Sequence, residues 1–161
     1  MNDSSILSTH TVIIGASAAG LAAAACLKQA GIDYVLLEQE SHVAARWRSH
    51  YDRLHLHTSR GFSGLPYRPM PPSYPRYASR DQFVAYLEDY AKQLDLAPRF
   101  GQRVRSVEQH NGEWITKTQD AEYHSRAVVV ATGYAREPVT PEFPGMETFK
   151  GTVIHSAAYK N

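Results

Sequence analysis

The alternation of apolar and polar residues divides the start of the chain into three elements. Residues 9–15 form a short apolar run with β-branched side chains that ends at a glycine, as is typical of a buried parallel strand. Residues 17–31 are rich in Ala and Leu and close on Gly31, so they read as a helix with a glycine at its C-cap. Residues 33–39 form a second apolar run that ends near Glu38. The pattern predicts a βαβ unit of ordinary length.

A helical period returns at residues 79–96. Ser79 is placed to cap this helix, and Gln82 occupies the capping-box position three residues later. The apolar positions recur at helical spacing, which predicts one buried face. They are Phe83, Leu87, Tyr90, Ala91 and Leu94.

Residues 103–118 alternate in polarity on both sides of Asn111-Gly112, which is the strongest short signal for a β-hairpin. Residues 121–127 predict another strand, and residues 128–131 a separate buried parallel strand. Residues 136–145 form a loop punctuated by prolines, and residues 151–155 predict a final strand.

The stretch between the second predicted strand and the helix at 79–96 breaks this rhythm. Residues 45–79 are rich in Arg, Pro, Tyr and Gly, and five prolines fall between Pro66 and Pro75. Regular structure is therefore not expected there. Folded patterns flank the stretch on both sides, which favours a structured loop over a site. A PxxP ligand for an SH3-like partner is the alternative.

Gly15, Ser17 and Gly20 follow the first strand in the pattern G-x-S-x-x-G. This is the dinucleotide-binding fingerprint with Ser as its middle residue. The first glycine permits a tight strand-to-helix turn, and the third permits close packing of helix and strand. The helix N-terminus then offers free N–H groups and a positive dipole end to phosphates.

Glu38 lies eighteen residues after Gly20, at the end of the second predicted strand. A carboxylate at this position accepts hydrogen bonds from ribose hydroxyls and repels a 2′-phosphate, which favours FAD or NAD over NADP. A plain NAD domain continues as alternating strands and helices. Here a long loop, a helix and a hairpin intervene instead, which favours the FAD-type variant of the fold.

Composition limits the partners. The 161 residues are enough for about one domain, and the net charge of +1 gives no reason to expect nucleic acid. No apolar run is long enough to span a membrane, and the first ten residues lack the pattern of a signal peptide. Cys26 is the single cysteine; it suits a reducing cytoplasm and, within an Ala-rich helix pattern, is expected to be buried.

With these features in place, the chain resembles the N-terminal half of a flavin-containing monooxygenase, closest in pattern to the branch with the plant YUCCA enzymes and their bacterial relatives. The matching pieces occur in order along nearly the whole chain. They are GASAAG, VLLEQ, RW, LHLHTSRGFSGLPY, YPRYASRDQFVAYLEDYA, ATGYAREPVTPEFPG and FKGTVIHSAAY. The last carries the signature F-x-G-x-x-x-H-x-x-x-Y at Phe149, Gly151, His155 and Tyr159. Baeyer–Villiger monooxygenases carry Trp instead of this final Tyr, so Tyr159 favours the flavin-containing branch.

The resemblance implies an α/β, Rossmann-like FAD-binding domain in an enzyme that also uses NADPH and O2. A C4a-hydroperoxyflavin in such enzymes oxygenates a small nucleophilic or carbonyl substrate. Mapped by position, the implied cofactor-binding residues fall into four groups. The residues expected at the pyrophosphate are Gly15, Ser17, Ala18, Ala19 and Gly20, and those at the ribose are Glu38 and Gln39. The residues expected along the flavin are Arg46, Trp47, His57 and Thr58. The small residues expected at the strand end, where the chain passes close to the cofactor, are Ala131, Thr132 and Gly133.

The chain departs from the family at two places. The family usually has Gly-Gly where this chain has Ala44-Ala45. Many relatives have Thr-Asn at the position of His57-Thr58, where the Asn steers oxygen chemistry, so no catalytic residue is assigned in this loop. His55 and His57 alternate as on a strand, but no Cys and few carboxylates accompany them, so no metal site is predicted. His155 is interpreted as a structural link between nucleotide domains.

The expected domain organisation is partial. Residues 1–161 are interpreted as the N-terminal part of a discontinuous FAD-binding domain, with residues 149–161 as the junction toward an absent NADPH domain, because no second glycine fingerprint occurs. The alternative is a stand-alone or truncated FAD- or nucleotide-binding module without catalysis of its own. An uncovered sheet edge favours pairing as a homodimer.

Overall fold

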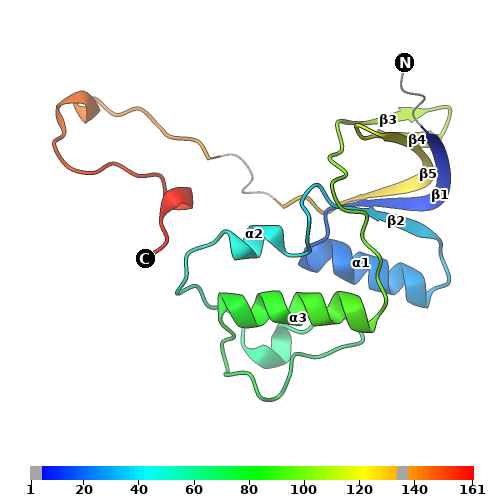
Figure 1. Cartoon of the computed structure of the whole chain (residues 1–161), viewed down its shortest axis with the longest axis horizontal. Helices are drawn as coiled ribbons and strands as arrows, with labels where there is room; N and C mark the ends of the chain where they lie inside the picture. The colour runs from blue at the N-terminus through cyan, green and yellow to red at the C-terminus, as the bar shows by residue number, and fades with distance from the viewer. Residues whose placement is uncertain (1–4, 134–137) are drawn as a thin grey trace.

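The computed structural model describes residues 5–133 and 138–161, and its strands form a five-stranded sheet (Figure 1). The strands are β1 (Ser5–Ile14), β2 (Tyr34–Leu37), β3 (Ser106–His110), β4 (Glu113–Lys117) and β5 (Ala121–Val130), in the order β2-β1-β5-β4-β3. β1 pairs in parallel with β2 and β5, whereas β4 pairs antiparallel with β5 and β3. The predicted α/β class is confirmed: a parallel βαβ start carries an antiparallel hairpin at one side.

The continuous apolar run of β1 reflects burial on both faces of the sheet. Successive side chains of a strand point to opposite faces. Ile13 belongs to a core shared with the helices, whereas Val12 and Ile14 pack with Leu37 and Tyr123 on the other face. Because neither face of β1 meets solvent along this stretch, the strand does not alternate between apolar and polar residues.

Helix α1 (Ala18–Gln29) connects β1 to β2 and ends as the sequence predicts. The Gly31 N–H donates to the Lys28 carbonyl at 3.1 Å, and the Ile32 N–H donates to the Leu27 carbonyl at 3.0 Å. Gly31 adopts a φ of +68°, a left-handed conformation that glycine takes without steric cost. Together these bonds form a Schellman motif, which turns the chain toward β2.

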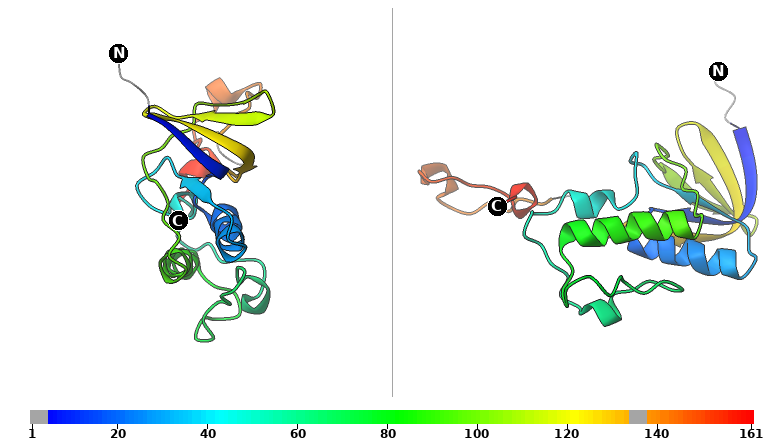
Figure 2. Two further views of the ribbon diagram at one scale, coloured as in Figure 1. Left: turned by 90° about the vertical axis from the view of Figure 1, so that its right-hand side faces the viewer. Right: turned by 60° about the horizontal axis from the view of Figure 1, so that its bottom comes forward.

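Helix α3 (Arg80–Gln93) lies beside α1 beneath the sheet (Figures 1 and 2). Its predicted capping box is confirmed, because the Gln82 N–H donates to the Ser79 hydroxyl while the Ser79 N–H donates to the Gln82 side chain. The residues of the predicted apolar stripe are buried or pack against the core. The local signals at 79–96 therefore locate both the start of the helix and its buried face.

The proline-rich stretch packs on α3 as a structured loop, with a short 3₁₀ helix η1 (Arg60–Phe62) inside it. The Tyr86 hydroxyl accepts from the Leu65 N–H at 2.6 Å and donates to the Arg68 carbonyl at 2.6 Å. The Tyr90 hydroxyl donates to the Pro66 carbonyl at 2.9 Å. Burial, ahead of its neighbours' charges, raises the pKa of Tyr90 to about 12, so this donor keeps its proton. Tyr86 and Tyr90 of α3 thus hold in place a loop whose internal β-pairing is limited to isolated bridges, such as that between Leu65 and Arg68.

Two strand predictions were wrong. Residues 121–127 and 128–131 do not form separate strands, because β5 runs unbroken beside β1 from the pair Ser5–Ala121 to the pair Ile14–Val130. Val130 at its end is 70% exposed instead of buried. Residues 151–155 form no strand, since no neighbouring strand among the described residues pairs with them.

The expected burial of Cys26 was also wrong, because the thiol lies on an exposed position of α1. The Ala-rich composition of α1 hides which of its faces meets the core. Leu21, Ala24 and Ala25 are the buried positions around it.

The last described segment, 138–161, extends away from the sheet and returns beside the short helix α2 (Ala45–Arg48) (Figures 1 and 2). It holds two 3₁₀ turns, η2 (Met146–Thr148) and η3 (Ser156–Ala158). Of the predicted loop at 136–145, residues 136 and 137 lie outside the described residues. Within the described ranges, no helix is long and apolar enough to cross a membrane.

Candidate functional site

A pocket of about 330 Å³ opens at the carboxyl ends of β1, β2 and β5. Ligands of open α/β sheets bind at this edge, where the strands end and the loops diverge. The pocket brings together seven of the residues predicted from the sequence. They are Gly15, Ser17, Glu38, Gln39, Arg46, Ala131 and Thr132.

The fingerprint turn is built by contacts that exclude side chains. Gly15 has a φ of +106°, and a Cβ added there would stand 2.6 Å from the Ala131 carbonyl oxygen. A Cβ on Gly20 would stand 1.8 Å from the Gly15 carbonyl oxygen. Close backbone packing therefore requires glycine at both positions, as the sequence motif predicts.

The start of α1 faces the pocket with unused donors. Its first helical bond runs from the Leu21 N–H to the Ser17 carbonyl at 2.8 Å, which leaves the preceding N–H groups of Ala18, Ala19 and Gly20 outside the helical ladder. Ser17 makes no side-chain cap, and the first turn holds no acidic residue. A negatively charged group at this end of α1 is favoured by these donors and by the helix dipole.

Glu38 joins the two turns that border the pocket. One carboxylate oxygen accepts from the Ala16 N–H at 2.8 Å, and the other accepts from the Glu40 N–H at 3.0 Å. Its side chain is almost buried, and it lines the pocket. Each carboxylate oxygen has two lone pairs, so Glu38 retains capacity to accept from a ligand hydroxyl.

The far wall of the pocket was missed by the sequence reading. It consists of Gln102, Val104, Arg105, Ser106 and Val107. The stretch before it is aligned with β2 through a single bridge between Leu37 and Arg99, and the Gln102 N–H donates to the Glu38 carbonyl at 2.8 Å. A bridge of one residue pair is too short to produce a periodic pattern of apolar residues in the sequence. The only sequence signal for this wall is the alternation of basic and apolar residues at 103–107.

The other predicted residues lie outside the pocket lining. The Trp47 ring packs edge-to-face on Phe83, with centroids 4.5 Å apart. His57 is exposed, and the Thr58 hydroxyl is 2.6 Å from that of Ser63. Gly133 follows Thr132 with a φ of +77°. Their predicted contacts with a flavin stay predictions.

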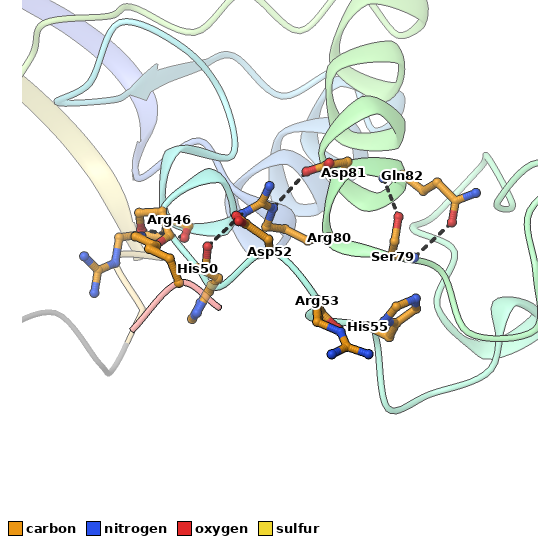
Figure 3. Close-up of polar contacts among 11 residues, drawn as sticks. Arg46, His50, Asp52, Arg53, His55, Ser79, Arg80, Asp81 and Gln82 are labelled. Atoms are coloured by element: carbon orange, nitrogen blue, oxygen red, sulfur yellow. Dashed lines mark hydrogen bonds and ion pairs between the residues drawn. The ribbon is translucent and has the colours of Figure 1, made fainter. Parts of the chain in front are cut away.

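A second polar cluster lies between α2 and the start of α3 (Figure 3). The Arg80 guanidinium donates to the Asp52 carboxylate at 2.7 Å and to the His50 carbonyl at 2.8 Å. The hydrogen bond from Arg80, followed by one from Asn161, holds the pKa of Asp52 below its ordinary value. Burial, then the positive charges of Arg46, Lys160 and Arg80, lowers the pKa of His50.

Comparison with known proteins agrees with this fold. Residues 12–161 match a family model described as pyridine nucleotide-disulphide oxidoreductase. The chain is 43% identical over 153 residues to the probable indole-3-pyruvate monooxygenase YUCCA4 of Arabidopsis thaliana, covering 93% of this chain and 37% of that protein. It is 45% identical over 154 residues to the indole-3-pyruvate monooxygenase YUCCA1 of Oryza sativa subsp. japonica, covering 93% and 38%.

Among solved structures, the flavin-containing monooxygenase from Stenotrophomonas maltophilia superposes with a TM-score of 0.86 at 34% identity, covering 96% of this chain and 47% of that one. An oxidized steroid monooxygenase bound to NADP superposes with a TM-score of 0.77 at 29% identity, covering 93% and 31%. The chain therefore spans less than half the length of each of these relatives.

Proposed function

The chain belongs to the pyridine nucleotide-disulphide oxidoreductase family, and on that basis we propose that it is the FAD-binding part of an NADPH- and O2-dependent flavin monooxygenase. The observation that carries the proposal is the pocket at the ends of β1, β2 and β5, where a glycine turn, a free helix N-terminus and a carboxylate converge. The monooxygenases among the relatives support the reaction class. The substrate class is a small nucleophile or a carbonyl compound.

The residues present fit the ADP half of FAD. The N–H groups at the start of α1 would hold the pyrophosphate, and Gly15 leaves the space that a side chain would fill. Glu38, with Gln39 beside it, would accept from the ribose hydroxyls. Val104 and Val107 on the far wall offer an apolar surface for a planar base. When bound, FAD supplies the electron carrier between NADPH and O2.

The proposed domain organisation follows from the relatives' length. Residues 1–161 would form the first part of a discontinuous FAD-binding domain, and residues 149–161 would lead toward an NADPH-binding domain. The lack of a second glycine fingerprint in this sequence supports a separate place for NADPH.

Equilibrium titration of the purified chain with FAD, followed by flavin fluorescence, tests the proposal. Glu38→Gln keeps the size of the side chain but removes its charge, so we expect its Kd to rise by roughly ten- to a hundredfold, the range for a hydrogen bond to a charged group. Glu108→Gln, on the exposed part of β3, is the matched control and should keep the wild-type Kd. Equal Kd values for both variants would contradict the proposal.

A ligand pair tests the predicted choice of nucleotide. ADP-ribose and its 2′-phosphorylated form differ only at the group that the Glu38 carboxylate faces. We expect wild-type chain to bind ADP-ribose more tightly and Glu38→Gln to reduce the difference. If wild type and Glu38→Gln prefer ADP-ribose to the same degree, Glu38 does not contact the ribose.

A further inference from the structure

The segment that returns from the extended tail is attached to the loop after α2. The Asp52 N–H donates to the Lys160 carbonyl at 2.9 Å, and the Lys160 ammonium donates to the Ser49 carbonyl. The Tyr51 and Tyr159 rings lie 6.3 Å apart. Residues 159–161 thus contact three positions of the short loop 49–52, although more than a hundred residues of chain separate them.

Arg80 fixes this loop from the other side. Its side chain is only 15% exposed, although Arg80 is the first residue of α3. One nitrogen donates to both the His50 carbonyl and the Asp52 carboxylate, and another donates to the Asp81 carboxylate at 2.8 Å (Figure 3). The Arg80 backbone N–H also donates to the Leu54 carbonyl at 2.8 Å. The loop is therefore attached to a helix end that a capping box already holds in place.

The same loop supports one wall of the pocket. The Ser49 N–H donates to the Ala45 carbonyl at 3.2 Å, and the Ser49 hydroxyl donates to the Arg46 carbonyl at 2.8 Å. Ala45 and Arg46 line the pocket from α2. A helix of four residues is not stable by itself, so α2 depends on contacts of this kind.

From these contacts we propose that Arg80 and Asp52 form a clamp that docks residues 159–161 on loop 49–52, and that this docking stabilises α2 at the pocket. Arg80, Asp52 and Lys160 are positioning residues, since they touch the loop and the tail and line no part of the pocket. The clamp itself rests on the contacts described here. Its effect on a flavin rests on the proposed function.

Hydrogen–deuterium exchange of the chain without any ligand tests the clamp. Asp52→Asn removes the charge that pairs with Arg80, and Lys160→Gln removes the ammonium that reaches Ser49. We expect several-fold faster exchange in peptides covering 45–52 for both variants. The controls are Asp33→Asn, an exposed carboxylate near β2, and Lys150→Gln, an exposed tail lysine, and both should exchange as wild type does.

The His50 ring supplies a second readout of the docked tail. Burial, and then nearby positive charges that include Lys160, lower the pKa of His50, so Lys160→Gln should raise the pKa that NMR measures for this ring. Lys160 is exposed, and this variant should therefore fold even if Asp52→Asn does not. Unchanged exchange at 45–52 together with an unchanged His50 titration in Lys160→Gln would overturn the clamp.

Flavin titration then separates the clamp from the proposed function. If the clamp stabilises α2, Lys160→Gln should bind FAD several-fold more weakly than Lys150→Gln. The expected exchange together with equal FAD affinities of Glu38→Gln and Glu108→Gln would retain the clamp and reject the pocket assignment. If Lys160→Gln binds FAD as wild type does and exchanges as wild type does at 45–52, the pocket assignment is retained and the clamp is rejected.

Discussion

At the scale of single residues, Gly20 shows how the nucleotide turn depends on a missing side chain. A Cβ at this position would stand 1.8 Å from the Gly15 carbonyl oxygen, which is backbone and cannot rotate away. We expect Gly20→Ala to destabilise the fold by about 3 kcal/mol or more, because the turn must open to admit the methyl group. Urea unfolding measures this loss. Gly61→Ala, where a Cβ meets nothing within 4 Å, should unfold near the wild-type midpoint, and equal midpoints for both variants would contradict the packing argument.

Ala44 occupies a position where the family resemblance implies glycine, and its backbone conformation is one that favours glycine. It has a φ of 60° and a ψ of 24°, and its side chain is fully buried. The left-handed conformation costs an alanine roughly 1–2 kcal/mol, but the buried methyl group offsets about 0.8 kcal/mol of that.

Two substitutions at Ala44 separate these effects. Ala44→Gly should change the free energy of unfolding by less than about 1 kcal/mol, because lost burial and added chain entropy oppose the relief of strain. Ala44→Val should lose more than about 2 kcal/mol, because a β-branched residue is a strong outlier in this conformation. Urea titration of the two variants checks the order. A valine variant as stable as wild type would refute the left-handed geometry.

At the scale of elements, β4 and β5 carry a charged cluster around His124. Its two ring nitrogens are each 2.8 Å from a carboxylate oxygen, one of Glu113 and one of Glu122. Both nitrogens can donate only when the ring is protonated. Hydrogen bonds to Glu113, and then to Glu122, raise the pKa of His124 above its ordinary value of 6.5, and the His124 bond lowers the pKa of Glu122.

This cluster predicts a pH dependence of stability with a defined sign. A raised pKa in the folded state means that the stabilisation is fully present below the unfolded pKa of His124 and disappears as pH rises through the folded one. We therefore expect the wild-type chain to lose stability relative to His124→Gln as pH rises from 6.5, the ordinary pKa of histidine, through the raised pKa of folded His124. Thermal unfolding across that range measures the difference. Parallel curves for the two proteins would contradict the predicted interaction.

Elements with local signals could be read from the sequence, and elements that depend on a distant partner could not. The capping box at Ser79, the Asn111-Gly112 turn and the Schellman glycine Gly31 each complete their bonds within a few residues, so the sequence suffices. The extent of β5 depends on β1, which lies alongside its whole length. Residues 151–155 have an apolar pattern, but none of the strands in the described part of the chain pairs with them, and an apolar pattern alone does not make a strand.

At the scale of the whole molecule, the pocket combines residues that are adjacent in sequence with residues that are not. The glycine turn and Glu38 could be predicted, because both follow directly from a βαβ unit with a fixed connection. The wall at 102–107 could not, since the path of the chain after α3 sets its position. The pocket therefore has a wall that the fingerprint alone does not predict.

This division leads to a prediction about which part of FAD the chain recognises. In the proposed function the glycine turn, the start of α1 and Glu38 would all hold the ADP half, whereas Trp47, His57 and Thr58 lie outside the pocket lining. A ligand that binds only the folded state stabilises it by mass action, by about 2.7 kcal/mol at a hundred times its Kd. We expect FAD and ADP to raise the melting temperature of the chain, and FMN, which lacks the AMP part of FAD and keeps a single phosphate, to raise it far less.

Thermal unfolding with each ligand at matched concentrations distinguishes the outcomes, and Gly20→Ala, whose turn is blocked, serves as the control that should respond to none of them. Stabilisation by FMN equal to that by FAD would show that the isoalloxazine end carries the binding, and it would assign the pocket between β2 and the 102–107 wall to another ligand. Stabilisation by ADP that Glu38→Gln abolishes would tie the effect to the carboxylate between the two turns, because this residue alone joins the strand end of β2 to the N–H of Ala16.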